Sequence, residues 1–301
     1  MPSPDPERST LRPVDPAALA HVERRLHGAP EAPWLHGEVA RRMADRLAVV
    51  RLQPAHVIDW GAFLGASREH LARVYPKARL LAVEADAARS AATAARLKAP
   101  WWRGWQGAAA VCSAGEVPAG SAQLLWSNMG LHGQVDPQAT LSAWQRALQV
   151  DGFLMFSTLG PGTLVQLQRL YAVQGWPVPM APLVDMHDLG DMMVQAGFAD
   201  PVMDQETVTL TWAEPQAVLS ELRGLGGNAD PRRAPGLRTP RWQKQLTAAL
   251  AALAGADGRI GLDFEIVYGH AFKPAPRPRL AARTELPLED MRAMVRRGSR
   301  P

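Results

Sequence analysis

Four residues between positions 59 and 84 have the types and the spacing of a nucleotide-binding turn. Asp59 ends an apolar run and is followed by Gly61 and Gly65. Glu84 ends the next apolar run, nineteen residues after Gly65. Glycine in the turn between a strand and a helix lets a cofactor approach the backbone, and a carboxylate at this distance can accept hydrogen bonds from both hydroxyls of a ribose. The alternative is a tight turn beside a solvated acid.

A second group of polar residues follows the fourth apolar run. Asn128 and His132 stand in the segment Ser-Asn-Met-Gly-Leu-His at 127–132. The Asn128 amide has the groups to orient a substrate or a cofactor, and the His132 imidazole can bind a carboxylate. Each residue also has a structural interpretation, because asparagine caps turns and a single histidine is weak evidence for a site. We predict no metal site, since no ligand set at metal-binding spacing surrounds His132.

These residues need a sheet that brings the ends of several strands together. Short apolar runs alternate with helical patterns, which is typical of a mostly parallel sheet with helices on both faces. We predict an α/β fold, a doubly wound, Rossmann-like sheet of seven strands with an antiparallel hairpin at one edge. The predicted strands are 57–60, 80–84, 109–112, 124–127, 153–158, 202–211 and 264–272. The predicted helices are 37–50, 66–75, 87–97, 137–149, 163–174, 188–196, 215–225 and 240–254.

Length and composition predict one folded domain with an extension at each end. The chain has 301 residues, of which 47% are hydrophobic and 21% charged, enough to bury a large core. We predict an N-terminal arm at 1–36, a domain at 37–273 and a flexible Arg- and Pro-rich tail at 274–301. The seven arginines and three acids of residues 277–301 account for the whole net charge of +4. Because the rest of the chain is neutral, we predict no nucleic acid partner.

The lack of a recognisable targeting signal and the low cysteine content predict a cytoplasmic location. The first twenty residues lack the apolar stretch of a signal peptide, and eighteen apolar residues never occur in succession. We therefore also predict no membrane partner. Cys112 is the single cysteine, which excludes an internal disulfide and every cysteine-rich metal site and fits a reducing compartment.

Several motifs in a fixed order make the pattern more specific than the glycine turn alone. They are Asp59-x-Gly61-x-x-x-Gly65, Glu84, residues 127–132, the strand at 153–158 with Leu-Gly-Pro-Gly-Thr-Leu after it, Leu-Gly-Gly-Asn at 225–228 and Tyr-Gly-His-Ala at 268–271. Over about residues 37–273 the chain resembles the class I S-adenosylmethionine-dependent methyltransferases of biotin synthesis. The resemblance implies methylation of the free carboxylate of a malonyl thioester on acyl carrier protein.

The resemblance also implies roles for particular residues. By resemblance, Asp59, Gly61 and Gly65 line the cofactor and Glu84 holds its ribose. We place Phe63, which stands in the same turn, with these cofactor-binding residues. Asn128 and His132 are the implied catalytic pair bordering the transfer site. Independently of the resemblance, Trp60 and Trp126 follow apolar strand residues, so one of them can face the sulfonium with its ring; the alternative is that both pack between the sheet and its helices. Transfer to an ionised carboxylate depends on alignment more than on acid–base chemistry. A cation must hold that carboxylate, and the candidates are Arg146, Arg169, Arg223, Arg232 and Arg233.

Several departures from the family pattern support a second hypothesis. Phe63 stands where the family has the middle glycine of its turn, and residues 107–114, around the third predicted strand, contain no acid to meet the adenine. The family's N-terminal tyrosine has no counterpart, and Gly133 replaces its tryptophan after Leu-His. The alternative is therefore a methyltransferase-like binding or scaffold protein without a cofactor. We favour the enzyme because the ribose acid, Glu84, is retained. A nicotinamide dehydrogenase is a third, less favoured hypothesis, because it would need the full glycine fingerprint, which this sequence lacks.

Overall fold

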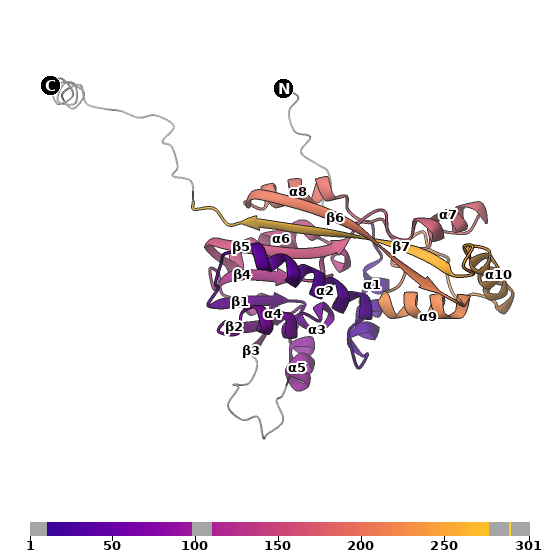
Figure 1. The fold of residues 1–301 in the computed structure, drawn as a ribbon, viewed down its shortest axis with the longest axis horizontal. Helices are drawn as coiled ribbons and strands as arrows, with labels where there is room; N and C mark the ends of the chain where they lie inside the picture. The colour runs from indigo at the N-terminus through magenta and orange to yellow at the C-terminus, as the bar shows by residue number, and fades with distance from the viewer. Residues whose placement is uncertain (1–10, 98–109, 277–288, 290–301) are drawn as a thin grey trace.

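The computed structural model describes residues 11–97, 110–276 and 289. The first ten residues of the predicted arm and nearly all of the predicted tail lie outside the described residues. The described residues form a seven-stranded sheet in the order β3-β2-β1-β4-β5-β7-β6, with helices on both sides (Figure 1).

The sheet has a parallel body and an antiparallel edge. The strands are β1 (His56–Trp60), β2 (Arg79–Glu84), β3 (Ala110–Ser113), β4 (Ala122–Ser127), β5 (Leu148–Leu159), β6 (Ala199–Trp212) and β7 (Ile260–Phe272). The first five pair in parallel, whereas β7 pairs antiparallel with both β5 and β6. The predicted fold class, including its edge hairpin, is confirmed.

Helices and short 3₁₀ turns connect these strands. The helices are α1 (Pro16–His27), α2 (Trp34–Arg46), α3 (Ala62–Gly65), α4 (Arg68–Val74), α5 (Ala87–Arg96), α6 (Pro137–Ala147), α7 (Val165–Val173), α8 (Met186–Gln195), α9 (Pro215–Leu225) and α10 (Pro240–Ala251). The 3₁₀ turns are η1 (Leu47–Val49), η3 (Ala114–Glu116) and η4 (Leu131–Gly133). Figure 1 shows α7, α9 and α10 grouped beyond one end of the parallel strands, near α1.

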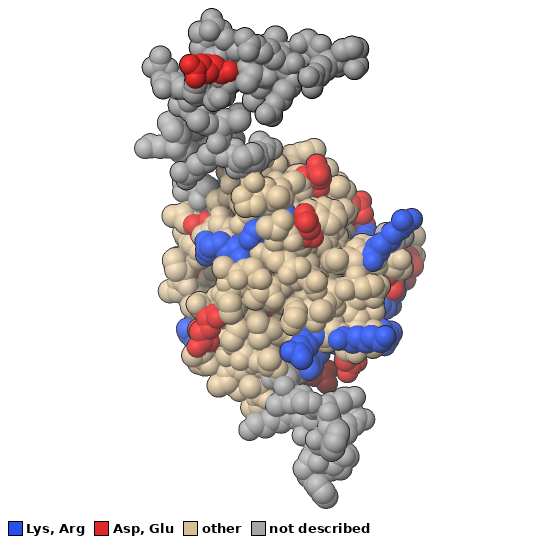
Figure 2. Space-filling model, turned by 90° about the vertical axis from the view of Figure 1, so that its left-hand side faces the viewer, with Lys and Arg blue, Asp and Glu red and all other residues tan. Residues whose placement is uncertain are grey.

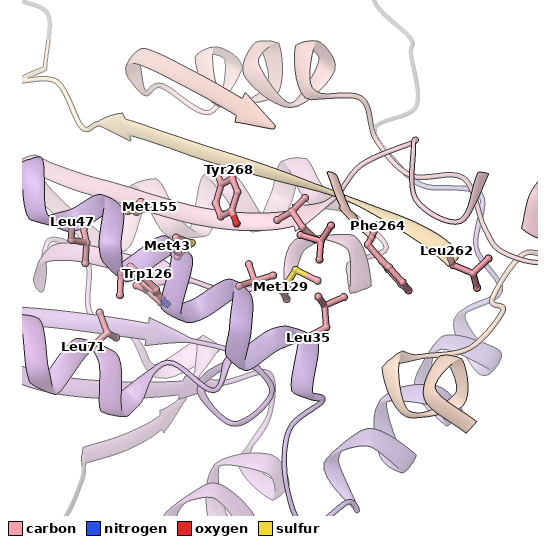
Figure 3. Close-up of a cluster of buried hydrophobic side chains, with 14 of the residues drawn as sticks. Leu35, Met43, Leu47, Leu71, Trp126, Met129, Met155, Leu262, Phe264 and Tyr268 are labelled. Carbon is pink, nitrogen blue, oxygen red and sulfur yellow. The ribbon is translucent and has the colours of Figure 1, made fainter. Parts of the chain in front are cut away.

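The core divides into two layers because side chains alternate across a strand. On β4, Leu124 and Trp126 pack into the layer that contains α2 and α4, and Leu125 packs into the layer that contains α6 and α8. Figure 3 shows the first layer, in which Trp126 and Tyr268 reach from the sheet toward Met43 of α2. A sheet covered on both faces explains why the central strands read as continuous apolar runs.

The helix α1 is the one element of the described arm that the sequence analysis does not predict. Asp15 caps it by accepting hydrogen bonds from the backbone of Ala17 and Ala18, and Pro16 occupies its first position. Along its length it brings Leu19, Val22 and Leu26 to the inner side of the molecule. The chain therefore places part of the predicted arm against the body of the protein.

Charges are mixed over the surface of the described residues. Figure 2 shows one face on which basic and acidic side chains are interspersed, with neither sign forming a continuous patch. Among the described residues, no helix has both the length and the apolar character needed to cross a membrane.

Candidate active site

A cavity of about 990 Å³ lies at the carboxyl ends of β1, β2 and β4. Gly61, Glu84 and Ser127, at or just beyond the ends of these strands, line what we call the strand wall. Eight residues of α1 line the opposite side, which we call the α1 wall, and α7, α9 and α10 close the far end. Ligands of doubly wound folds bind at this edge of the sheet, so the cavity occupies the expected position.

The two glycines of the turn after β1 have different environments. Gly61 lines the cavity at φ +75°, and a Cβ built on it would meet nothing within 4 Å. A Cβ on Gly65 would lie 3.5 Å from the backbone oxygen of Asn128, so Gly65 allows the turn to pack against the end of β4. Gly61 is therefore open to a ligand, whereas Gly65 shapes the wall behind it.

Glu84 is a buried carboxylate with one oxygen already in use. Its Oε1 accepts hydrogen bonds from the backbone N–H of Phe63 and from Thr93 Oγ1, both at 2.9 Å. The other oxygen has no hydrogen-bond donor within the part of the chain that the structure describes. Burial raises the pKa of Glu84 above its usual value. Because Glu84 lines the cavity, this second oxygen is placed to accept a ribose hydroxyl.

The Phe63 ring packs against the C-terminal end of α1. It lies 5.6 Å from the ring of His27 and 3.9 Å below the guanidinium of Arg96. Arg96 in turn donates hydrogen bonds to the backbone oxygens of His27, at 2.7 Å, and Ala29, at 3.1 Å. Phe63 is not among the residues that line the cavity. The bulky residue in the glycine turn therefore fastens the turn to α1.

Asp59 lies beneath the turn. It is 3% exposed, its Oδ1 has no hydrogen-bond partner, and it does not line the cavity. Burial is the main cause that raises the pKa of Asp59 to about 7, and the charge of Glu84 adds to it. The carboxyl group therefore changes its charge near neutral pH.

Asn128 binds three backbone and side-chain groups around the turn. Its Nδ2 donates to the backbone oxygens of His36 and Gly65, each at 2.7 Å, and its Oδ1 accepts from Ser157 Oγ at 2.7 Å. The side chain is buried and does not line the cavity. This predicted catalytic residue therefore joins α2, the turn and β5 from outside the lining of the cavity.

His132 does line the cavity, beside a second histidine that the sequence analysis missed. The rings of His132 and His36 lie 6.4 Å apart, edge to face. Burial lowers the pKa of His132 to about 3, with further contributions from His36 and Arg12. Burial likewise lowers the pKa of His36 to about 4, and its Nδ1–H donates to the Leu64 oxygen at 2.8 Å. Both imidazoles are therefore neutral at pH 7, and the Nδ1 atom of His132 has no partner.

The two tryptophans proposed for the sulfonium have different positions. Trp60 lines the cavity and meets Trp144 edge to face, with 6.4 Å between the ring centroids. Trp126 is buried in the core, where its Nε1–H donates to Ser67 Oγ at 2.7 Å (Figure 3). Trp60 is thus the tryptophan that a cationic ligand in the cavity could reach.

The five arginines suggested by the sequence divide into two groups. Arg223 and Arg233 line the cavity, whereas Arg146, Arg169 and Arg232 do not. Sequence reasoning missed Arg12, which lines the cavity and is only 9% exposed. The signal near Arg12 was the Asp-Pro pair at 15–16, which starts a helix and so predicts that the arm packs on the domain.

The cavity fits an adenosyl cofactor on its strand wall. The open backbone at Gly61 and the unused oxygen of Glu84 match the sugar and its neighbouring groups, and Trp60 supplies an aromatic face. The nearest acid after β3 is Glu116, whose Oε2 accepts from the N–H and the Oγ of Ser113 at 2.9 and 2.6 Å. That carboxylate caps η3 and is already satisfied.

Two curated relatives are similar over most of the chain. The malonyl-[acyl-carrier protein] O-methyltransferase of Laribacter hongkongensis is 40% identical over 269 residues, which cover 86% of this chain and 90% of that protein. The protein of the same name from Gallionella capsiferriformans is 36% identical over 272 residues, covering 88% and 93%. No protein-family model matches the chain.

Solved structures share the fold at low sequence identity. The YcgJ protein of Bacillus subtilis has a TM-score of 0.54 at 12% identity, covering 79% of this chain and 99% of that one. The BH2331 protein of Bacillus halodurans has a TM-score of 0.52 at 14% identity, covering 78% and 98%.

Proposed function

The chain belongs to the malonyl-[acyl-carrier protein] O-methyltransferase family, and we propose that it transfers a methyl group from S-adenosylmethionine to the carboxylate of malonyl-acyl carrier protein in biotin synthesis. The resemblance drawn from the motifs is confirmed by these relatives. The observation that carries the proposal is the half-used carboxylate of Glu84 in a cavity whose glycine turn is open.

In this proposal the strand wall holds the cofactor. The second oxygen of Glu84 accepts the ribose hydroxyls, the backbone at Gly61 lets the cofactor approach, and the face of Trp60 meets the sulfonium. Asp59 and Gly65 support the turn from behind, and Phe63 ties it to α1. S-adenosylmethionine supplies an electrophilic methyl group when it is bound.

The remaining walls position the acceptor. A malonyl carboxylate is already ionised at pH 7, so the reaction needs alignment and no general base. His132 is neutral under these conditions and can donate one hydrogen bond without changing charge, whereas the single proton of neutral His36 is already used on the Leu64 oxygen. Asn128 is a positioning residue, because it holds the turn and α2 in place. The α1 wall separates the reacting groups from water.

The geometry gives little support to the cofactor-less scaffold hypothesis. That hypothesis rests mainly on Phe63, whose ring would have to occupy the space of the methionine group. The ring instead packs against His27 and Arg96, and Phe63 does not line the cavity.

The test measures binding and turnover with the full chain. Calorimetry should detect binding of S-adenosylmethionine and of its demethylated product, S-adenosylhomocysteine. In a turnover assay, malonyl-acyl carrier protein should be converted to its methyl ester. Glu84→Gln should weaken cofactor binding by about 10-fold or more because it removes a charged acceptor. Thr93→Val, which alters the other side of the same carboxylate, should weaken it less. Absence of binding by the wild-type chain at millimolar cofactor would refute the proposal.

A further inference from the structure

Arg12 is a buried cation without an acidic partner. It is 9% exposed, and in the described parts of the chain no carboxylate lies within ion-pair distance of it. Burial lowers the pKa of its guanidinium. A buried charge without a counter-ion costs several kcal/mol relative to water, so proteins rarely keep one that has no use.

Carbonyl groups satisfy only part of this guanidinium. Its Nη1 donates to the backbone oxygens of His132 and Gln134, and its Nη2 donates to the backbone oxygen of Pro182 at 2.9 Å. An arginine side chain has five N–H donors. The three contacts therefore leave one donor on Nη2 and the donor on Nε, and Nε is buried with no partner. Donors on these two nitrogens can meet both oxygens of one carboxylate.

Arg12 also lies beside the cavity residue that the motifs predicted. Its guanidinium holds the backbone oxygen of His132, and its charge helps to lower the pKa of the His132 imidazole. Both side chains line the cavity, and the Nδ1 atom of His132 is a second buried polar atom without a partner. Two neighbouring unsatisfied groups at the β4 end of the cavity indicate a polar, anionic ligand.

The other arginines of the cavity are less suited to this role. They are Arg25, Arg89, Arg223, Arg233 and Arg238. Two of them already pair with a carboxylate, Arg89 with Glu23 and Arg233 with Asp15, each at 2.7 Å. The remaining three are half-buried or exposed, so water can satisfy their donors. Arg12 alone among these six combines burial with the absence of a described acidic partner.

We propose that Arg12 holds the free carboxylate of the malonyl thioester, with the His132 imidazole as its neighbour. The assignment rests on the function proposed above and names its substrate subsite. A carboxylate has about four lone-pair positions, so two can bind Arg12 while another attacks the methyl carbon. The carbon–sulfur bond breaks with its electron pair on sulfur, and no proton moves. The product ester is neutral, so the ion pair is lost once the reaction is complete.

The experiment compares two thioesters that share the same pantetheine arm. The full chain is saturated with S-adenosylhomocysteine, and binding of malonyl-coenzyme A and acetyl-coenzyme A is measured by calorimetry. Wild type should prefer the malonyl thioester. Arg12→Gln should weaken malonyl binding by about 10- to 100-fold and leave acetyl binding unchanged. Arg12→Lys keeps the charge but lacks the paired N–H donors of the guanidinium, so its affinity for the malonyl thioester should lie between those of wild type and Arg12→Gln. The control is Arg146→Gln, an exposed arginine outside the cavity, which should match wild type.

A structural role for Arg12 predicts a different result. If the side chain only joins the loops around His132, Arg12→Gln lowers the melting temperature and keeps the malonyl preference, which overturns the assignment. Absence of S-adenosylhomocysteine binding by wild type would instead overturn the proposed function and the assignment with it.

A second measurement uses the unaltered chain. The ¹⁵Nε–H resonance of Arg12, identified by its loss in Arg12→Lys, should shift when malonyl-coenzyme A is added in the presence of S-adenosylhomocysteine. Acetyl-coenzyme A should leave it in place. Equal responses to the two thioesters contradict the assignment even if Arg12→Gln fails to fold.

Discussion

The two walls of the cavity are held by different kinds of interaction. The strand wall is fixed by buried hydrogen bonds, with Asn128 joining the backbone of Gly65 to Ser157 of β5. The α1 wall is fastened by partly exposed charged groups, such as the ion pair of Arg89 with Glu23. Buried networks tolerate little loss, whereas partly exposed ion pairs contribute little and are screened by salt. The comparison indicates a firmly held strand wall and a less firmly held α1 wall.

The strand wall should break most readily at Asn128. Asn128→Ala removes three buried hydrogen bonds and leaves their partners unsatisfied, so we expect a loss of about 3–5 kcal/mol in the free energy of unfolding. Urea denaturation measures this. The matched control is Asn228→Ala, which removes two partly buried hydrogen bonds and should cost about 1–2 kcal/mol. Equal losses at the two positions would contradict the proposed difference in rigidity.

Asp59 should make the strand wall sensitive to pH. Its pKa of about 7 in the folded protein lies above the unfolded value near 4, so the folded state binds the additional proton between these limits. The contribution of the protonated Asp59 carboxyl group to the free energy of unfolding is complete below pH 4 and is lost as the pH rises through 7. The free energy of unfolding of Asp59→Asn, measured relative to that of wild type, should therefore be about 2 kcal/mol higher at pH 8 than at pH 5. Denaturation at both pH values measures the difference, and a constant difference would contradict it.

Phe63 tests the contact between the walls. Phe63→Gly removes the stacking with Arg96 and adds a flexible residue, so we expect a loss of about 1–2 kcal/mol and faster amide exchange in α1. Cofactor affinity should fall. Phe63→Leu keeps the bulk without the aromatic face and should show a smaller effect. If Phe63→Gly instead binds S-adenosylhomocysteine more tightly than wild type, the Phe63 ring obstructs the cavity and our description of the ring is wrong.

The smallest effect is expected at the ion pair on α1. Glu23→Gln should lower the free energy of unfolding by less than about 1 kcal/mol and should weaken cofactor binding about 2- to 5-fold at low salt. At 1 M salt the variant and wild type should converge because charge is screened. Asp45→Asn, on the outer face of α2 and in an exposed pair with Arg41, controls for general charge effects. A difference that persists at 1 M salt would show that screening is not the cause.

The strand wall could be predicted because its information is local. An apolar run that ends in Glu84, at the right distance from Gly65, is sufficient to place that carboxylate at the sheet edge, and the structure places it there. The direction of Phe63 could not be predicted, because it depends on Arg96 and on the end of α1. The identity of a residue alone does not predict which distant side chain will stack on its ring.

The substrate side was harder to predict because its contacts are distant in sequence. Arg12 meets the backbone of His132, 120 residues away, and no spacing pattern connects them. For Asn128 the sequence leaves two roles open, the orientation of a substrate or cofactor group and the capping of a turn. Its amide binds the backbone oxygens of Gly65 and His36, and this arrangement depends on how α2 packs.

The way α1 is attached has a thermodynamic consequence. Near its C-terminal end it is bound to α5, the helix that follows the Glu84 strand, through the side chain of Glu23 and the backbone oxygen of His27, and at its N-terminal end Asp15 pairs with Arg233. A ligand that orders one end of such a helix reduces the entropic cost of ordering the other. Cofactor and thioester should therefore bind with positive cooperativity, and the coupling must be equal in both directions.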